Sequence, residues 1–176
     1  MMEEKVYMGI DPGSKGFITI QEKGDFTHVS IEDNDLYQLS EKMHEIRLKY
    51  PNLTCVMESV HAVFGSSAKA TFAFGFNNGY LIGLLCANKI PYVLVPPQKW
   101  QKEMWEHSDM VVTYKQTTIK GKQIMKKDVN TKQTSINCCK RLFPMLDLRK
   151  SERAKKIDDN KVDSILLCEY GRRKNL

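Results

Sequence analysis

Short apolar runs separated by glycine-containing turns fill the first thirty residues, and this pattern predicts strands. Gly13 and Gly16 supply the first flexible turn, and Gly24 with Asp25 supplies the second. Strands that follow one another through tight turns pair as an antiparallel meander. The expected strands are residues 6–10, 17–21 and 26–31.

After residue 35 the apolar spacing becomes helical, and Pro51 and Asn52 end that helix. Strands and helices then alternate, which predicts an α/β fold with a mixed sheet and helices packed against it. The segment 68–87 is rich in Ala, Phe and Leu, and we expect a buried helix, tightly packed or interrupted at its three glycines. The expected elements are helix 36–50, strand 53–57, helix 68–87, strand 91–95 and helices 97–105, 131–142 and 159–172.

Residues 108–130 are polar and rich in lysine, so they have little to bury. We expect a flexible basic loop there. A chain of 176 residues is long enough for one substantial core and short for two. The prediction is therefore one domain spanning residues 1–176.

The composition narrows the class of protein. We find no run close to the roughly 20 apolar residues that a membrane-spanning helix needs, and the first five residues are polar and acidic rather than signal-like. The sequence therefore predicts a cytosolic protein without a membrane segment. The five cysteines lack metal-ligand spacing and mostly lie in apolar runs, so neither disulfides nor a zinc site is expected.

Charge is unevenly distributed along the chain. Residues 1–60 hold six Lys/Arg against eleven Asp/Glu, whereas residues 61–176 hold 21 against 10. A concentrated basic region favours a polyanionic partner, because lysines and arginines on phosphates release condensed counterions. A solvated lysine-rich surface is the alternative that charge alone leaves open.

Three groups of acids are candidates for chemistry. Asp11 follows the first strand and precedes Pro12-Gly13, where it can face a ligand or simply form the turn. Glu58 closes the apolar run 53–57, so its carboxylate needs a metal ion or a basic neighbour. Asp159 and Asp163 lie one helical turn apart ahead of an apolar stripe.

Asp158 or Asp159 can also serve as an ordinary helix cap. If these acids converge, their hard oxygen ligands suit Mg²⁺. Two such ions about 4 Å apart can activate a water and stabilise the leaving oxygen of a phosphodiester.

Over nearly its whole length the chain resembles the RuvC-like Holliday junction resolvases, especially the compact phage-type members. Each matching motif is modest, but their order and spacing are specific. The matching stretches are residues 9–16, 57–61, 72–75, 79–85, 95–100, 141–144 and 159–173, with Lys132 and Ser135.

This resemblance implies an RNase H-like fold, a homodimer, and four acids that hold two Mg²⁺ ions, or Mn²⁺ in their place. Carried onto this sequence, the acids are Asp11, Glu58, Asp163 and Asp159, with Asp158 as a substitute for Asp159. Lys132 matches a basic residue that can stabilise the phosphate in the transition state. The implied activity is structure-selective cleavage of four-way or other branched DNA.

Several residues are candidates for DNA contact. Phe72, Phe74 and Phe76 lie in a stretch that approaches DNA and the dimer partner in this family, although core packing is the more ordinary role. His61 follows Glu58 by three residues and can reach metal or phosphate. The stretch from Lys115 to Lys132 holds six lysines against Asp128 alone, and we hypothesise that it grips DNA arms. Its main candidates are Lys122, Lys126 and Lys127.

Other interpretations remain open. The opening Gly-Ile-Asp-Pro-Gly is also similar to actin-like ATPases and sugar kinases, but those proteins repeat the fold in two lobes, for which 176 residues are too few. A nuclease for RNA–DNA hybrids or a transposase-like enzyme shares the metal chemistry, and fold does not fix substrate. A catalytically silent protein that binds branched DNA is the third possibility.

Overall fold

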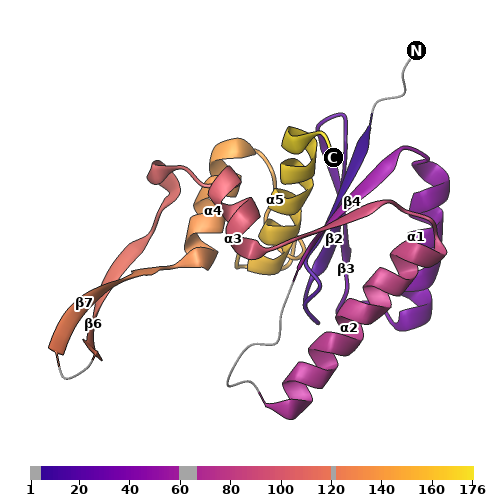
Figure 1. The fold of residues 1–176 in the computed structure, drawn as a ribbon. Coiled ribbons are helices and arrows are strands. Elements are labelled where there is room, and N and C mark those ends of the chain that lie inside the picture. The colour runs from indigo at the N-terminus through magenta and orange to yellow at the C-terminus, as the bar shows by residue number, and fades with distance from the viewer. Residues whose placement is uncertain (1–4, 60–66, 120–121) are drawn as a thin grey trace.

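The computed structural model describes residues 5–59, 67–119 and 122–176. A five-stranded sheet in the order β3-β2-β1-β4-β5 forms its centre (Figure 1). β1, β2 and β3 pair antiparallel, whereas β4 runs parallel to both β1 and β5. The mixed sheet predicted from the sequence is confirmed. Its strands are β1 (Val6–Ile10), β2 (Phe17–Glu22), β3 (Asp25–Ser30), β4 (Leu53–Glu58) and β5 (Tyr92–Val95).

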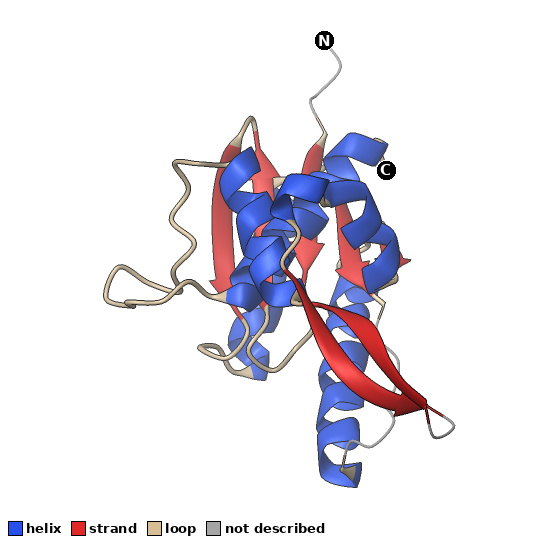
Figure 2. Ribbon diagram, turned by 90° about the vertical axis from the view of Figure 1, so that its left-hand side faces the viewer, coloured by secondary structure: helices blue, strands red, loops and turns tan. Residues whose placement is uncertain are grey.

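Helices cover both faces of this sheet (Figures 1 and 2). One apolar cluster joins the strands to α1 (Leu36–Lys49) and α2 (Ala68–Ala87). A second joins the opposite face to α3 (Pro97–Met104), α4 (Thr131–Leu142) and α5 (Asp159–Lys174). The sheet is therefore the middle layer of three.

Strand alternation decides which side chains face α5. Ile10 and Met57 lie in the cluster with α1 and α2, whereas Val56 lies in the cluster with α5. Successive residues of a strand point to opposite faces. Asp11, one position after Ile10, and Glu58, two positions after Val56, therefore belong to the α5 face.

α5 is seated directly on β1 and β2. A Cβ at Gly9 would lie 2.1 Å from the Ser164 carbonyl oxygen and 2.5 Å from the Cys168 nitrogen, so only glycine fits there. The hydroxyls of Thr19 and Ser164 hydrogen-bond at 2.6 Å. These contacts fix the height and rotation of α5, and with them the placement of the acids that it carries.

The structure corrects the expectation that helix 68–87 is buried. Its buried residues are Leu81, Leu84 and Leu85, near its C-terminal end. Apart from the helix's own backbone and the adjacent residues, no described atom lies within 4 Å of a Cβ added at any of its three glycines, so the expected tight packing there is absent from the described chain. The helix extends past the end of the sheet (Figure 1), and nothing in the described residues covers that part.

The same helix also corrects the expectation that no segment is apolar enough to span a membrane. By length and composition α2 passes that test, with 17% of the tested window buried. Core helices of soluble proteins pass it as well, so one such helix does not indicate a membrane protein. The cytosolic location stays a prediction.

The lysine-rich segment is not the loop that its polarity suggested. It forms the short 3₁₀ helix η1 (His107–Asp109) and a hairpin of β6 (Val112–Ile119) and β7 (Lys122–Val129). The hairpin pairs antiparallel from Val112–Val129 to Ile119–Lys122. Polar residues such as threonine and glutamine fit strands when the ribbon has no core to cover, and for that reason the apolar pattern missed it.

Candidate active site

Asp11 is held at the end of β1 by a tight turn. The Gly13 N–H donates to the Asp11 carboxylate at 3.1 Å, and the Asp11 N–H donates to the Phe17 carbonyl at 3.1 Å. A Cβ at Gly16 would lie 1.9 Å from the Asp11 carbonyl oxygen, so the turn closes only over glycine. The Pro-Gly turn therefore positions the carboxylate as well as reversing the chain.

Glu58 ends β4 and receives a hydrogen bond that sequence reasoning missed. The Trp100 Nε1–H donates to the Glu58 carboxylate at 2.9 Å, and the Trp100 side chain is completely buried. The sequence patterns described above assign no role to Trp100. Its distance of 42 residues from Glu58 in the chain leaves no local signal for this contact.

α5 supplies the remaining acids. Asp158 is the N-cap, and its carboxylate accepts from the backbone N–H groups of Asn160 and Lys161 at 3.0 and 3.2 Å. Asp159 is the first helical residue and forms an ion pair with Lys132 at 2.5 Å. Asp163 lies one turn further along, and its Oδ1 atom is buried without a hydrogen-bond partner in the described structure.

Lys132 approaches the acids from α4, whose first turn is capped by Asn130. Its ion pair with Asp159 raises the pKa of the ammonium, and the nearby charges of Asp163 and Asp11 add to this. Lys132 therefore lies beside three of the predicted acids. Its side chain remains largely exposed, so it can also reach a molecule bound outside.

Burial and neighbouring charges shift the pKa values of the acids. Burial is the main cause that raises the pKa of Asp163 to about 8; a hydrogen bond from the Ser135 side chain opposes the shift, and the charges of Asp11, Glu58 and Asp159 add to it. Burial raises the pKa of Asp11 to about 7 against the Gly13 hydrogen bond, and Glu58 and Asp159 again contribute. Burial also raises the pKa of Glu58, which the Trp100 hydrogen bond opposes. A bound cation would offset both the burial of these carboxylates and the repulsion that Asp11 and Asp163 experience.

The donor set suits a hard divalent ion, although the acids do not form a finished cage. Among the described residues, no three His, Cys, Asp or Glu side chains are close enough to hold a metal as they stand. The donors that Asp11, Glu58, Asp159 and Asp163 offer are carboxylate oxygens, which Mg²⁺ and Mn²⁺ accept. The unpartnered Oδ1 of Asp163 adds a buried acceptor that a cation would satisfy.

The candidate DNA contacts fall on two elements outside this cluster. Phe72 and Phe76 of α2 are 76% and 50% exposed, so they are not the core residues that their type suggested, while Phe74 is half-buried. Lys126 and Lys127 are exposed on β7. Lys122 begins β7, but its side chain lies outside the described part, as does the whole of His61.

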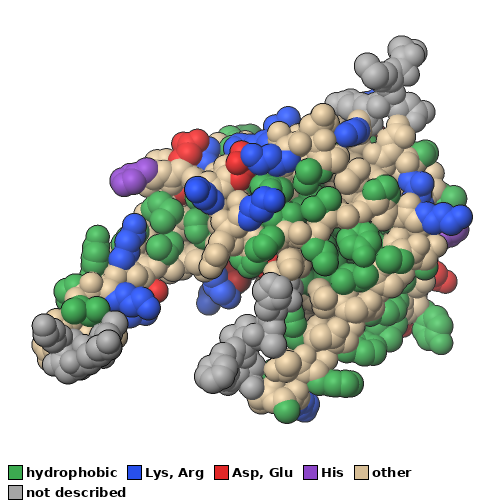
Figure 3. Space-filling view, viewed as in Figure 1, with side chains coloured by type: hydrophobic (Ala, Val, Ile, Leu, Met, Phe, Trp, Pro, Cys, Tyr) green, Lys and Arg blue, Asp and Glu red, His purple; other side chains and the backbone are tan. Residues whose placement is uncertain are grey.

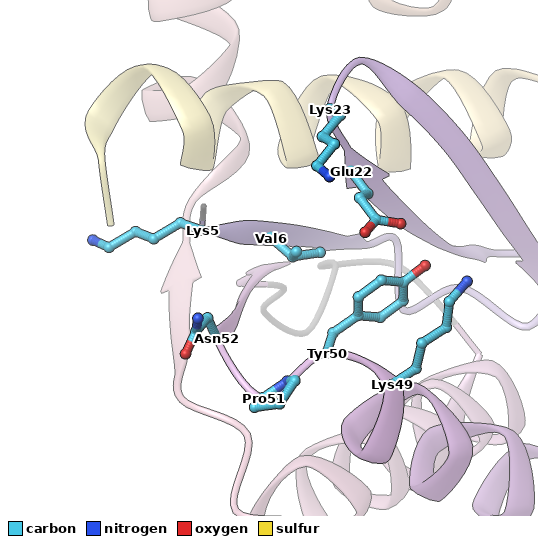
Figure 4. Close-up of a pocket in the computed structure, with 8 residues that line it drawn as sticks. All are labelled: Lys5, Val6, Glu22, Lys23, Lys49, Tyr50, Pro51 and Asn52. Carbon is cyan, nitrogen blue, oxygen red and sulfur yellow. The ribbon is translucent and has the colours of Figure 1, made fainter. Parts of the chain in front are cut away.

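Two hollows elsewhere contain none of the predicted acids. One, of about 320 Å³, lies where β1 and β4 begin and β2 ends, and Lys5, Glu22, Lys49 and Tyr50 are among its lining residues (Figure 4). It is at the opposite end of the sheet from Asp11. The other lies beside the turn after Asp11, between that turn and α1 and α2.

The five-stranded mixed sheet with helices on both faces is an RNase H-like fold. Two solved structures of RuvC from Thermus thermophilus share it. The first, described as RuvC in complex with a Holliday junction substrate, has a TM-score of 0.55 and 8% identity, with 96% of each chain covered. The second has a TM-score of 0.52 and 12% identity, covering 97% of this chain and 96% of the other. No protein-family model matches the sequence, and no curated protein is significantly similar to it.

Proposed function

We propose that this protein is a metal-dependent endonuclease that resolves four-way DNA junctions. The observation that carries the proposal is the placement of three acids toward one end of the sheet, on the face that α5 covers: Asp11 after β1, Glu58 at the end of β4, and Asp163 on α5. They are near enough for the charges of Asp11 and Glu58 to act on Asp163. They are the three acids that the sequence resemblance matches directly to metal ligands, and the chain shares the fold of RuvC, which has been solved in complex with a Holliday junction substrate. Acids that raise one another's pKa at a buried site are typical of functional centres.

Each residue of the site has a proposed role. Asp11, Glu58, Asp163 and Asp159 would hold Mg²⁺, which when bound activates water and stabilises the leaving oxygen. Trp100 fixes the Glu58 carboxylate through its indole N–H. Lys132 places an ammonium beside the acids, where it can pair with a phosphate oxygen on which negative charge develops.

The placement of the two adjacent acids favours Asp159 over Asp158 as the fourth ligand. Asp158 already uses its carboxylate to cap α5, whereas Asp159 pairs with Lys132. Both acids raise the pKa of Asp11, but only Asp159 contributes to that of Asp163 as well. We expect Asp159→Asn to weaken Mn²⁺ binding and cleavage strongly. Asp158→Asn, which keeps a capping oxygen, should change both by less than threefold. The reverse ranking would assign the ligand to Asp158.

The proposed assembly is a homodimer formed through α2. The helix exposes Phe72 and Phe76 together with its glycines, and the edge strand β5 beside it exposes Val93 and Leu94. Figure 3 shows hydrophobic side chains gathered over this region. A contiguous apolar patch on a folded protein marks an interaction surface, and open glycines let a second helix approach closely.

The dimer can be tested without damaging the folded chain. A Cβ at Gly79 meets nothing among the described atoms, so Gly79→Leu leaves the monomer intact while blocking a close approach of two helices. Tyr37→Glu on α1 is the matched control, since Tyr37 is 85% exposed on another helix. Light scattering should give a dimer for wild type and control and a monomer for Gly79→Leu. A dimer in all three would reject α2 as the interface.

The substrate is tested with a panel of labelled nucleic acids. Wild-type protein with Mg²⁺ is incubated with a four-way junction, the matched duplex, the single strand and an RNA–DNA hybrid. The proposal predicts cleavage of the junction, at least tenfold faster than of the duplex. Cleavage of the hybrid alone would assign an RNase H activity, and junction binding without cleavage would assign a silent binding protein.

A further inference from the structure

The β6–β7 hairpin is a separate two-stranded ribbon that projects from the body of the protein (Figures 1 and 2). Tyr114 and Met125, from its two strands, are each 64% exposed. A hairpin without a second layer is marginally stable in water. Such an element must be fixed at its base, and its free surface is available to a partner.

The base of the hairpin is fixed to α4. The Val111 N–H donates to the Thr134 hydroxyl at 3.1 Å, and the Asn130 N–H donates to the Val111 carbonyl at 2.9 Å. Just before β6, the buried Asp109 accepts two hydrogen bonds from Arg141 of α4, at 2.9 and 2.8 Å. A charged, two-point bond of this kind resists rotation as well as separation.

The same helix carries Lys132, so the hairpin is tied to the acidic site. Lys132 follows the cap residue Asn130 by two positions and contacts Asp159. Each hairpin strand has eight residues. At about 3.4 Å per residue the ribbon reaches about 27 Å from its base. Because each base pair advances duplex DNA by about 3.4 Å, this reach corresponds to about eight base pairs.

The charge of the ribbon matches DNA. Its register places Lys115 opposite Lys126 on one face and Lys127 opposite Tyr114 on the other, and all three lysines are exposed. The ribbon's one acid, Asp128, is neutralised by Lys115 at 2.5 Å. Lysines on both faces can reach phosphates of both strands that border a groove, and the DNA major groove admits a two-stranded ribbon.

The direction of the hairpin agrees with this partner. β4 ends at the acidic end of the sheet, and both the hairpin and the N-terminal end of α2 extend beyond that end (Figure 1). The hairpin is fixed to α4, and α4 and α2 cover opposite faces of the sheet. DNA held at the acids would therefore lie within reach of the ribbon.

We propose that the hairpin is a fixed-reach contact to a duplex arm, binding phosphates within about eight base pairs of the point where the arm passes the hairpin base. The position of the cut rests on the proposed function, but the contact itself is a property of binding. Affinity should therefore depend on arm length, and the hairpin lysines should carry that dependence.

The test is an arm-length series measured without cleavage. Fluorescence anisotropy in Ca²⁺ compares junctions whose loop-closed arms have 6 or 14 base pairs. The test variant is Lys115→Gln/Lys126→Gln/Lys127→Gln. The matched control is Lys23→Gln/Lys49→Gln/Lys89→Gln, which removes the same charge from exposed lysines far from the acidic end.

Wild type and control should bind the long arms at least tenfold more tightly than the short ones. The test variant should lose that difference, and the slope of log affinity against log salt should fall by about 0.9 for each lost phosphate contact. Equal behaviour of the two triple variants would overturn the proposal. The wild-type protein could also show no junction cleavage while the arm-length dependence disappears in the test variant. That result would support the hairpin contact and reject the proposed catalysis.

Discussion

The hydrogen bond from Trp100 to Glu58 gives a sharp prediction about metal binding. Trp100→Phe keeps an aromatic ring in the buried site but removes the N–H that lies 2.9 Å from the carboxylate. A hydrogen bond to a charged group contributes about 1.5–3 kcal/mol. If it favours the ligating carboxylate, its loss weakens metal binding by about 10- to 100-fold, the range found for groups that orient ligands.

Trp105 provides a matched control for that variant. Its ring packs against Trp100 with centroids 6.2 Å apart, but its Nε1 is buried without a partner in the described structure. Trp105→Phe therefore removes the same atoms from the same cluster without removing a bond to an acid. Both variants should lose thermal stability, and only Trp100→Phe should lose metal affinity.

The assay is calorimetric titration of each variant with Mn²⁺, with thermal unfolding measured on the same samples. A ¹⁵N-labelled wild-type protein adds an independent readout, because the Trp100 indole resonance should move on metal addition more than that of Trp105. Equal Mn²⁺ affinity in the two variants would refute a positioning role for Trp100, whatever their stabilities.

Three further predictions concern stability. The folded, metal-free protein holds the pKa of Asp163 at about 8 and that of Asp11 at about 7, above their values in the unfolded chain. The stability that these two groups contribute is therefore complete below about pH 4 and is lost as the pH rises through 7 to 8. Urea unfolding in EDTA should show this loss, and Asp163→Asn should reduce it; an unchanged pH dependence in the variant would contradict the assignment. Gly9→Ala should cost about 1–3 kcal/mol because its methyl meets the α5 backbone, whereas Gly75→Ala in open space should cost nothing; equal effects would contradict the close approach. Arg141→Met should cost about 3–5 kcal/mol because it strands the buried Asp109, and the exposed neighbour Lys140→Met, as control, should stay within about 0.5 kcal/mol.

The central layers of the fold could be predicted because their signals are local. Glycine turns separate the apolar runs of β1, β2 and β3, and a helical period ends at Pro51, so element type followed from spacing. The helix 68–87 was placed correctly and its burial was wrong. Apolar composition indicates that a helix surface will be buried, but it does not indicate whether the same chain or a second chain buries it.

The β6–β7 hairpin was missed because its strands lack an apolar pattern. Its strands carry polar residues such as Lys115, Gln116 and Thr117 without an apolar face, so periodicity gave no strand signal. Its stability comes from pairing and from the base that Arg141 holds, neither of which has a local signature. Burial of apolar surface is what sequence periodicity reports, and this ribbon buries little.

Within the site, the ends of strands indicated Asp11 and Glu58, and helical spacing indicated Asp163. Sequence left Asp158 and Asp159 open, because either can cap a helix. Only the folded structure shows that Asp158 bonds to the backbone while Asp159 pairs with Lys132. The Trp100 contact needed the fold as well, since β4 and α3 meet only after the sheet has formed.

The most direct test of the central claim is cleavage of a four-way DNA junction by wild type and Asp163→Asn, with junction binding measured in the same samples. Asp163 combines the buried, unpartnered oxygen with the influence of the other acids. The account predicts Mg²⁺-dependent cleavage by wild type that EDTA abolishes, and a variant that binds the junction with unchanged affinity but cuts it at least 100-fold more slowly. Equal cleavage by the two proteins, or cleavage that persists in EDTA, would contradict it.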